Sequence, residues 1–361
     1  MTALVKNIIG VKPGSAATET GPSESVVKFL TVDEESAGQR LDNFLFRHLK
    51  GVPKTHVYRI IRSGEVRINK GRVQAETRIV RGDVLRLPPV RVSARVEESA
   101  SKPAPARQFP VLIEDDALLA IDKPAGVAVH GGSGVSFGAI EQLRTARPTA
   151  KFLELVHRLD RDTSGILLVA KKRSALTALQ EQFRERETGK TYLALVDGTW
   201  PANKKVLDSP LAKYLLPGND GTPEAGERRV RVVAKDHPDA MRAVTLVRVL
   251  TRLTLPGDAG PMSLLAVTIK TGRTHQIRVH LASAGHAIAG DDKYGTSDRQ
   301  RALTKLGLRR MFLHAWRLQF THPTSGERVS LQTDLPPELH VLMPPSAIEA
   351  LAQHPTPTSD A

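Results

Sequence analysis

The sequence predicts an α+β protein in which a small basic module of helices and strands precedes a larger mixed domain. Between residue 109 and about residue 342, strand-like and helical stretches alternate without the strict repeat of a doubly wound sheet. Residues 38–91 hold 13 Lys or Arg against 4 Asp or Glu, a local net charge of +9. The stretch VEESASKPAPARQFP between the two parts is polar and proline-bearing, which is typical of a linker.

These observations predict five segments. Residues 1–30 are rich in Ser, Gly, Thr, Ala and Glu without periodicity, and we expect a mobile tail there. The basic module then covers residues 31–91, the linker 92–108 and the mixed domain 109–345. Residues 346–361 are expected to form a second loose tail.

Two amphipathic helices open the basic module. A first helix that ends near Gly51 is indicated by apolar residues at helical spacing: Leu41, Phe44, Leu45 and Leu49. A second helix begins at Pro53, and its apolar face consists of Val57, Ile60 and Ile61. Arg59 and Arg62 project from the opposite face of this helix. The stretches GEVRINKGRV and RIVRGDVLRLPP predict two strands joined by a turn at residues 69–71, and a closing strand.

In the mixed domain, the clearest element is a buried strand at residues 166–170. A helix follows it, marked by Leu176, Leu179 and Phe183. KTYLALVDG alternates like a further strand, and residues 243–252 and 262–270 predict a hairpin across PGDAGP. RTHQIRVHLASAG predicts a helix that stops at Gly285.

Composition excludes several classes of protein. The chain has 361 residues, a net charge of +14 and a pI near 10.1, which favours a polyanionic partner, either nucleic acid or an anionic membrane surface. No stretch approaches 18 consecutive apolar residues, and the N-terminus lacks the apolar region of a signal peptide. Without cysteine the chain has no disulfides, thiolate metal ligands or cysteine nucleophiles. We therefore expect a cytoplasmic protein that does not span a membrane.

The basic module resembles a known RNA-binding domain. Helical arginines such as Arg59 and Arg62 are most often solvated, but several further basic residues in the same short module favour phosphate contact: Lys54, Arg67, Lys70, Arg72, Arg78 and Arg81. The string AGQRLDNFLFRHLKGVPKTHVYRIIRSGEVRINKGRV resembles an S4 domain. This resemblance implies that Lys54, Arg59 and Arg62 contact structured RNA.

The string HRLDRDTSG, residues 157–165, places two arginines and two aspartates directly before the buried strand. The plainest interpretation is a salt-bridged turn. A zinc site is disfavoured because His157 has no partner at ligand spacing. A hydrolase built from Ser164, His157 and Asp160 lacks the G-x-S-x-G elbow around the serine.

The complete string resembles the second motif of the pseudouridine synthases, in the branch that modifies large-subunit ribosomal RNA. That motif reads H-R-L-D-x-x-T-S-G and is followed by an apolar strand, as it is here. LAIDKPAGVAVHGG resembles the first motif, KTYLALV the segment with the active-site tyrosine, and TGRTHQIRVHL the third motif. The resemblance covers residues 38 to about 340, while the stretch LLPGNDGTPEAGERRVRVV is less familiar.

The resemblance implies a fold, a reaction and a set of site residues. The fold is a largely antiparallel mixed sheet flanked by helices, and the reaction isomerises uridine to pseudouridine in 23S ribosomal RNA. Asp160 falls on the catalytic aspartate, Tyr192 on the active-site tyrosine and Arg278 on the arginine that pairs with the aspartate. Arg158 falls on the residue that fills the space left by the flipped uridine.

Further expectations concern the loop and the partners. His157 and Thr163 are expected to shape the loop and contact the substrate region. An isomerisation adds and removes no group or electron, so we expect no cofactor and no metal. We also expect a monomer. A non-catalytic RNA-binding factor with the same fold, and transfer RNA as the substrate, remain the alternatives.

Overall fold

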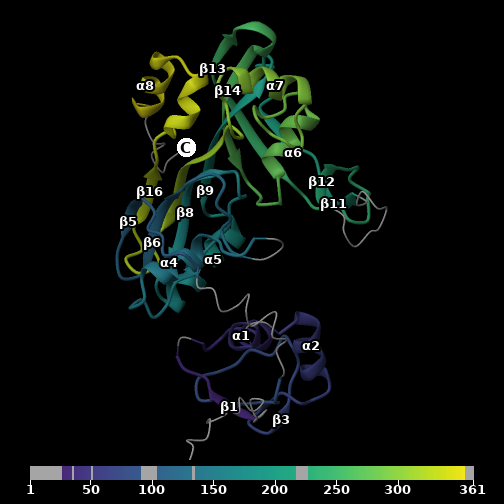
Figure 1. Ribbon diagram of the computed structural model, residues 1–361, viewed down its shortest axis with the longest axis vertical. Coiled ribbons are helices and arrows are strands. Elements are labelled where there is room, and N and C mark those ends of the chain that lie inside the picture. The colour runs from purple at the N-terminus through teal and green to yellow at the C-terminus, as the bar shows by residue number, and fades with distance from the viewer. Residues whose placement is uncertain are drawn as a thin grey trace, which may run out of the picture. The chain divides into compact units, whose positions relative to one another are not determined.

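The computed structural model describes residues 27–34, 36–49, 52–90, 104–131, 135–216 and 227–353. The chain divides into two compact units, Met1–Lys102 and Pro103–Ala361, which are described separately below (Figure 1). The predicted α+β class is confirmed in both of them. Among the described residues, no helix has the length and apolar character needed to cross a membrane.

The N-terminal unit combines two helices with a four-stranded antiparallel sheet in the order β1-β4-β2-β3. Its elements are β1 (Lys28–Thr31), α1 (Leu41–His48), α2 (Lys54–Arg62), β2 (Arg67–Ile68), β3 (Gly71–Arg72) and β4 (Val84–Leu87). The apolar face predicted for α2 is buried, with Val57, Ile60 and Ile61 at most 4% exposed. Packing of this stripe leaves the basic face of α2 to solvent.

The expected boundaries of both tails are wrong, because each tail was predicted to include residues that are folded. Lys28–Thr31 forms strand β1, paired with β4 from Lys28 opposite Leu87 to Thr31 opposite Val84. At the other end, helix α8 (Pro345–Gln353) packs Leu351 into the core of the C-terminal unit. Backbone pairing stabilises a short strand whatever its composition, so low periodicity did not reveal β1. Residues 1–26 and 354–361, and 91–103 of the expected linker region, lie outside the described residues.

The C-terminal unit is built on a ten-stranded sheet. Its main path runs β10-β13-β14-β9-β15-β8-β6-β5, with β16 paired to β15 and β7 paired to β8. The strands are β5 (Val111–Glu114), β6 (Leu118–Lys123), β7 (Glu154–Leu155), β8 (Ser164–Ala170), β9 (Gly189–Asp197), β10 (Val206–Asp208), β13 (Val244–Leu255), β14 (Gly260–Ile269), β15 (Leu313–Thr321) and β16 (Arg328–Gln332). All pairs are antiparallel except β8 with β15. The expected largely antiparallel mixed sheet is therefore confirmed.

Helices and one separate hairpin complete this unit. The remaining elements are α4 (Ala139–Ala146), α5 (Arg173–Glu185), α6 (Gln276–Ser283), α7 (Ser297–Lys305), the short 3₁₀ turns η2 (Gly257–Ala259) and η3 (Pro337–Leu342), and the hairpin strands β11 (Leu211–Leu216) and β12 (Glu227–Val232). The hairpin lies at the edge of the unit, with β12 beside α6 (Figure 1). The predicted β13–β14 hairpin and the stop of α6 before Gly285 are confirmed.

Strand β8 lies inside the sheet and is covered on both faces. All seven of its residues are buried. Leu167 and Val169 belong to one hydrophobic cluster, whereas Ile166 and Leu168 belong to the cluster that includes Leu176 and Leu179 of α5. Burial on both faces explains the unbroken apolar run in the sequence. The charged string before this strand therefore lies at the end of a rigid element.

Gly165, the second residue of β8, allows the close parallel approach of β15. It has φ +111 and lies opposite Ala315, and a Cβ atom added here would overlap the backbone of Ala315. We predict that Gly165→Ala lowers the free energy of unfolding by about 3 kcal/mol, from overpacking together with an unfavourable φ. Gly272→Ala is the control, because no heavy atom lies within 4 Å of its added Cβ. Equal urea-unfolding midpoints for the two variants would contradict this account of the β8–β15 contact.

Candidate active site

The loop before β8, strand β9 and the start of α6 meet around a cavity of about 110 Å³. Five of the residues singled out from the sequence line it: Arg158, Asp160, Thr163, Tyr192 and Arg278. His157 lines an adjacent groove instead. The order β14-β9-β15-β8 in the sheet, with α6 following β14 in the chain, brings together segments more than 100 residues apart.

A buried lysine anchors the loop that carries Asp160. Lys123 is fully buried at the end of β6, and its Nζ donates to the carbonyl oxygens of Pro124, Val127 and Arg161 at 2.9, 2.8 and 3.2 Å. Burial lowers the pKa of Lys123 to about 7. The Thr163 N–H also donates to the Asp160 carbonyl at 3.2 Å. These bonds fix the loop backbone, not the Asp160 side chain.

His157 is held within the fold. Its Nε2 accepts the Leu168 N–H at 3.1 Å, and its ring stacks on Phe183 at 4.8 Å between centroids. Burial, with a smaller effect of the Lys190 charge, lowers the pKa of His157 to about 3. The imidazole is therefore neutral and ties the loop to β8.

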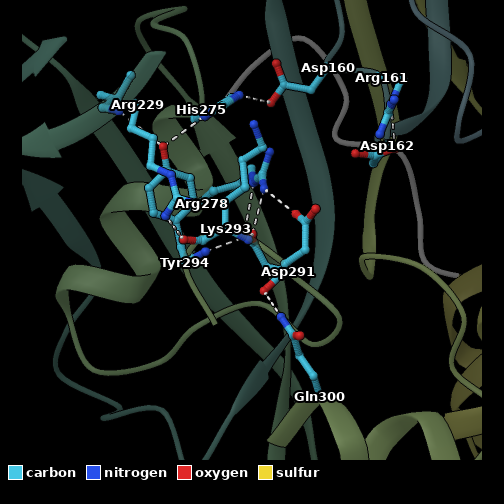
Figure 2. A network of polar contacts seen from close by, with 12 residues as sticks. Asp160, Arg161, Asp162, Arg229, His275, Arg278, Asp291, Lys293, Tyr294 and Gln300 are labelled. Carbon is cyan, nitrogen blue, oxygen red and sulfur yellow. Dashed lines mark hydrogen bonds and ion pairs between the residues drawn. The ribbon is translucent and has the colours of Figure 1, made fainter. Parts of the chain in front are cut away.

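Asp160 turns its carboxylate toward the start of α6. Its side chain is 22% exposed, and Oδ2 lies 4.0 Å from Nε2 of His275, whose side chain is 14% exposed (Figure 2). His275 has φ +53 and caps the N-terminus of α6. Sequence reasoning missed this histidine, although it stands three residues before Arg278 in the same motif.

The expected direct pairing of Arg278 with Asp160 is wrong. The Arg278 guanidinium binds Asp291 through two hydrogen bonds, from Nε to Oδ2 at 2.7 Å and from Nη2 to Oδ1 at 2.6 Å. Nη2 also donates to Oδ1 of Asp292 at 3.3 Å. Within the described part of the chain, no ion pair joins Arg278 to Asp160. A bidentate carboxylate is the stronger partner, because both of its oxygens match the guanidinium fork.

Asp291 is a second residue that the sequence analysis missed. It is fully buried, and its Oδ1 also accepts the N–H groups of Lys293 and Tyr294 at 2.9 and 3.1 Å. Burial alone would lower the pKa of Arg278, but the hydrogen bonds and charge of Asp291, with a contribution from Asp160, raise it above its ordinary value. The acidic turn GDDKYG after α6 was the available signal for this site.

Tyr192 lies on β9, between β14 and β15, and is 9% exposed. Burial, and to a smaller extent the charge of Asp160, raises the pKa of the Tyr192 phenol. The phenol is accordingly neutral and borders the cavity beside Asp160.

A groove of about 450 Å³ adjoins this cavity and shares Arg158 and Tyr192 with it. Six of its lining residues are basic: Arg158, Arg184, Arg186, Lys190, Lys270 and Arg273. Lys190 precedes Tyr192 by two residues on β9, so the two side chains share a face of the sheet. No acidic side chain of the described chain lines this groove, which makes it suitable for a polyanion.

The hydrolase and zinc alternatives find no support in the geometry. Ser164 is buried, and its Oγ lies 2.8 Å from Nδ1 of His314 and accepts from Arg310 at 2.7 Å. His157 bonds to Leu168 instead, so Ser164, His157 and Asp160 do not form a relay. Across the described ranges, no group of three or more His, Cys, Asp or Glu side chains could hold a metal ion.

Lys54, Arg59 and Arg62, which were expected to contact RNA, all lie on α2. Arg59 is 60% exposed, with its guanidinium 3.6 Å from Glu65, and Arg62 is exposed. The Lys54 ammonium lies over the Phe46 ring at 5.3 Å. This basic face belongs to the N-terminal unit.

Comparison with known proteins identifies the class. Residues 117–283 match the RNA pseudouridylate synthase family, and residues 39–85 match the S4 domain. The chain belongs to the RNA pseudouridylate synthase family, with an S4 domain before the synthase domain. The two resemblances found in the sequence are thereby confirmed, and the protein is an enzyme that isomerises uridine in RNA.

The relatives of the chain carry more specific names than the family. The chain is 49% identical over 320 residues to the ribosomal large subunit pseudouridine synthase C of Pasteurella multocida, covering 88% of this chain and 93% of that protein. It is 49% identical over 314 residues to the protein of the same name from Escherichia coli strain K12, covering 86% and 93%. Among solved structures, human RNA pseudouridylate synthase domain containing 1 is similar with a TM-score of 0.52 and 26% identity, covering 71% of this chain and 100% of that one.

His314, fully buried on β15 beside the site, gives a pH prediction. Burial, then the nearby Arg310 charge, lowers the pKa of His314 to about 3, whereas an unfolded histidine titrates near pH 6.5. Between these values the unfolded chain binds one more proton, so stability falls as the pH falls. We predict that His314→Asn, which keeps a polar atom near Ser164, flattens this decline by about 1.4 kcal/mol per pH unit below pH 6.5. Urea unfolding from pH 7.5 to 4.5 measures the effect, and parallel curves would contradict it.

Proposed function

We propose that this enzyme isomerises specific uridines of 23S ribosomal RNA to pseudouridine, with the Asp160 carboxylate as the catalytic group acting on a flipped-out nucleotide. The names of the two bacterial relatives support the large-subunit RNA as substrate. The observation that carries the proposal is the meeting of Asp160, Tyr192 and Arg278 around one cavity beside a basic groove.

The reaction breaks the N1–C1′ bond of uridine and joins C5 to C1′. C5 loses its proton to solvent and the freed N1 takes one up, so the composition of the nucleotide does not change. The Asp160 carboxylate, partly exposed at the cavity, acts on the ribose while the detached uracil turns. The neutral Tyr192 phenol stacks on the uracil ring and assists removal of the C5 proton.

Arg278 contributes a positive charge that is held in a fixed position at the cavity. Asp291 fixes the guanidinium in one orientation, so its positive charge stands at the cavity that Asp160 also lines. A preorganised charge of this kind does not have to be rearranged during the reaction. The ion pair between Arg278 and Asp291 therefore holds the guanidinium in place for Asp160 and does not withdraw it from the site.

RNA reaches this site along the basic groove. Extruding a stacked uridine costs a few kcal/mol, and the exposed Arg158 fills the space that the base leaves. His157 and Thr163 keep the loop in shape through their bonds to Leu168 and Asp160. Lys54, Arg59 and Arg62 of the S4 domain contact phosphates elsewhere on the same RNA.

The enzyme consists of two domains joined by a linker. The S4 domain extends from β1, which begins at Lys28, to residue 91, the linker covers 92–108, and the synthase domain runs from 109 to the end of α8 at Gln353. The enzyme works as a monomer in the cytoplasm, where ribosomal RNA is made. Light scattering of the purified protein tests the monomer, and a dimer would overturn that part.

The Asp160→Asn substitution tests the proposal directly. The amide keeps the shape of the side chain but cannot act as a carboxylate, so we predict a loss of pseudouridine formation of more than about 10³-fold, with unchanged RNA affinity. Tritium release from 5-tritiated uridine in a 23S RNA fragment measures turnover, and filter binding measures affinity. Turnover by this variant at the wild-type rate would rule out Asp160 as the catalytic group.

The S4 domain yields a separate prediction. Charge reversal of Arg59 and Arg62 together should raise KM by about tenfold or more with kcat nearly unchanged, because phosphate contacts supply affinity and register. Each lost contact should also flatten the log–log salt dependence of binding by about 0.7 to 0.9. Reversal of Arg301 and Lys305, on exposed α7 of the other unit, is the matched control. A fall in kcat with KM and salt slope unchanged would mean that the domain serves the chemistry.

A further inference from the structure

A chain of side-chain contacts links the peripheral β11–β12 hairpin to Asp160. The Val230 N–H of β12 donates to Oη of Tyr294 at 3.3 Å, and Oη lies 2.9 Å from Nδ1 of His275. The other ring nitrogen, Nε2, faces Oδ2 of Asp160 at 4.0 Å. Figure 2 shows His275 between Tyr294 and Asp160.

The donors in this chain support one assignment of the His275 proton, in which the Tyr294 phenol donates to Nδ1. A backbone N–H can only donate, so the Tyr294 oxygen accepts from Val230. The single phenolic proton of Tyr294 is then free to point at Nδ1 of His275. A neutral imidazole that accepts at Nδ1 carries its proton on Nε2, the atom that faces the Asp160 carboxylate.

Tyr294 is itself held from three sides. Its ring packs with the cluster of Leu211, Val230, Ala243 and Val279, which joins the hairpin to α6. The Arg278 guanidinium lies 5.2 Å from the centre of the same ring. The neighbouring Lys293 carbonyl accepts from Nη1 of Arg229 on β12 at 2.8 Å. One side chain therefore supports both His275 and Arg278 at the cavity.

The backbone of His275 fits a positioning role. A residue other than glycine with φ +53 is uncommon and persists only where its surroundings fix it. Here that conformation places the ring between α6 and the Asp160 loop. Burial lowers the pKa of His275, helped by the charges of Arg278 and Lys293 and opposed by Asp160 and Asp291, so the neutral ring prevails.

We propose that Tyr294 is a positioning residue that holds His275 as a neutral Nε2–H donor facing Asp160, with the β11–β12 hairpin as its support. This inference rests on the proposed role of Asp160 as the catalytic carboxylate. The distance of 4.0 Å is longer than a hydrogen bond and shortens when the uridine enters, as catalytic contacts do on substrate binding. The neutral donor orients the carboxylate and leaves its charge available to the ribose.

Kinetics of a small set of variants test the proposal. Tyr294→Phe removes only the hydroxyl and keeps the ring under Arg278, and we expect kcat to fall about tenfold with KM within twofold of wild type. His275→Gln places an amide N–H near the position of Nε2 and should retain more activity than His275→Ala. Tyr214→Phe is the matched control, because this tyrosine lies on β11 outside the chain of contacts, and it should leave kcat unchanged.

A double variant tests more sharply whether Tyr294 acts through His275. If Tyr294 acts through His275, adding Tyr294→Phe to His275→Ala should lower kcat no further. Independent, multiplying losses in the double variant would overturn the proposal, as would wild-type kcat in Tyr294→Phe. An equal loss in Tyr214→Phe would also overturn it, because the effect would then belong to the hairpin as a whole. Melting temperatures of all variants show whether a loss of activity comes from loss of the fold.

A spectroscopic measurement decides the proton position without relying on activity. In the full-length protein with ¹⁵N-labelled histidine, the ring signals of His275 are assigned by their loss in His275→Gln. We expect the Nε2-protonated form in wild type and a mixture of tautomers in Tyr294→Phe. A wild-type ring protonated on Nδ1 would overturn the inference. Inactivity of wild type on 23S RNA would instead refute the proposed function, and the ¹⁵N spectrum would still decide this proposal.

Discussion

The site depends on the anchoring of one loop to the end of a buried strand. Strand β8 is covered on both faces, so the loop before it cannot shift without disturbing two hydrophobic clusters. The buried Lys123 ties that loop to the turn after β6 through three carbonyl oxygens, which satisfies the donors of an ammonium removed from water. Asp160 is consequently presented to the cavity from a backbone that is already in place. Positional accuracy of this kind is what orientation effects in catalysis require.

A second constraint acts from the opposite wall. Arg278 is fixed by Asp291, whose carboxylate is in turn held by two backbone N–H groups of the turn after α6. A buried arginine and aspartate stabilise each other only when their hydrogen bonds are satisfied, as they are here. The cavity therefore has a firmly held guanidinium on one side, and on the other the loop whose backbone is fixed beneath Asp160.

Sequence reasoning recovered the fold class and the residues that meet at the cavity, because motif order and apolar periodicity are local signals. It failed where the decisive contact is made between distant segments. Arg278 was expected on Asp160, but the bidentate Asp291 thirteen residues further on takes the guanidinium. The role of His275 depends on a tyrosine and on a hairpin strand that only the fold brings together. Strand β1 was missed because backbone pairing, not side-chain pattern, defines it.

We infer that the position of the Asp160 carboxylate, and not only its charge, makes the enzyme act on uridine. The most direct test maps pseudouridines in 23S ribosomal RNA from cells that lack this protein, after complementation with wild type or with Asp160→Glu. Glutamate keeps the charge but moves the carboxylate by about one methylene, a displacement that can cost about 100-fold in rate. We predict that specific pseudouridines vanish on deletion, return with wild type and stay absent or sparse with Asp160→Glu. Full restoration by glutamate, or an unchanged map on deletion, would contradict it.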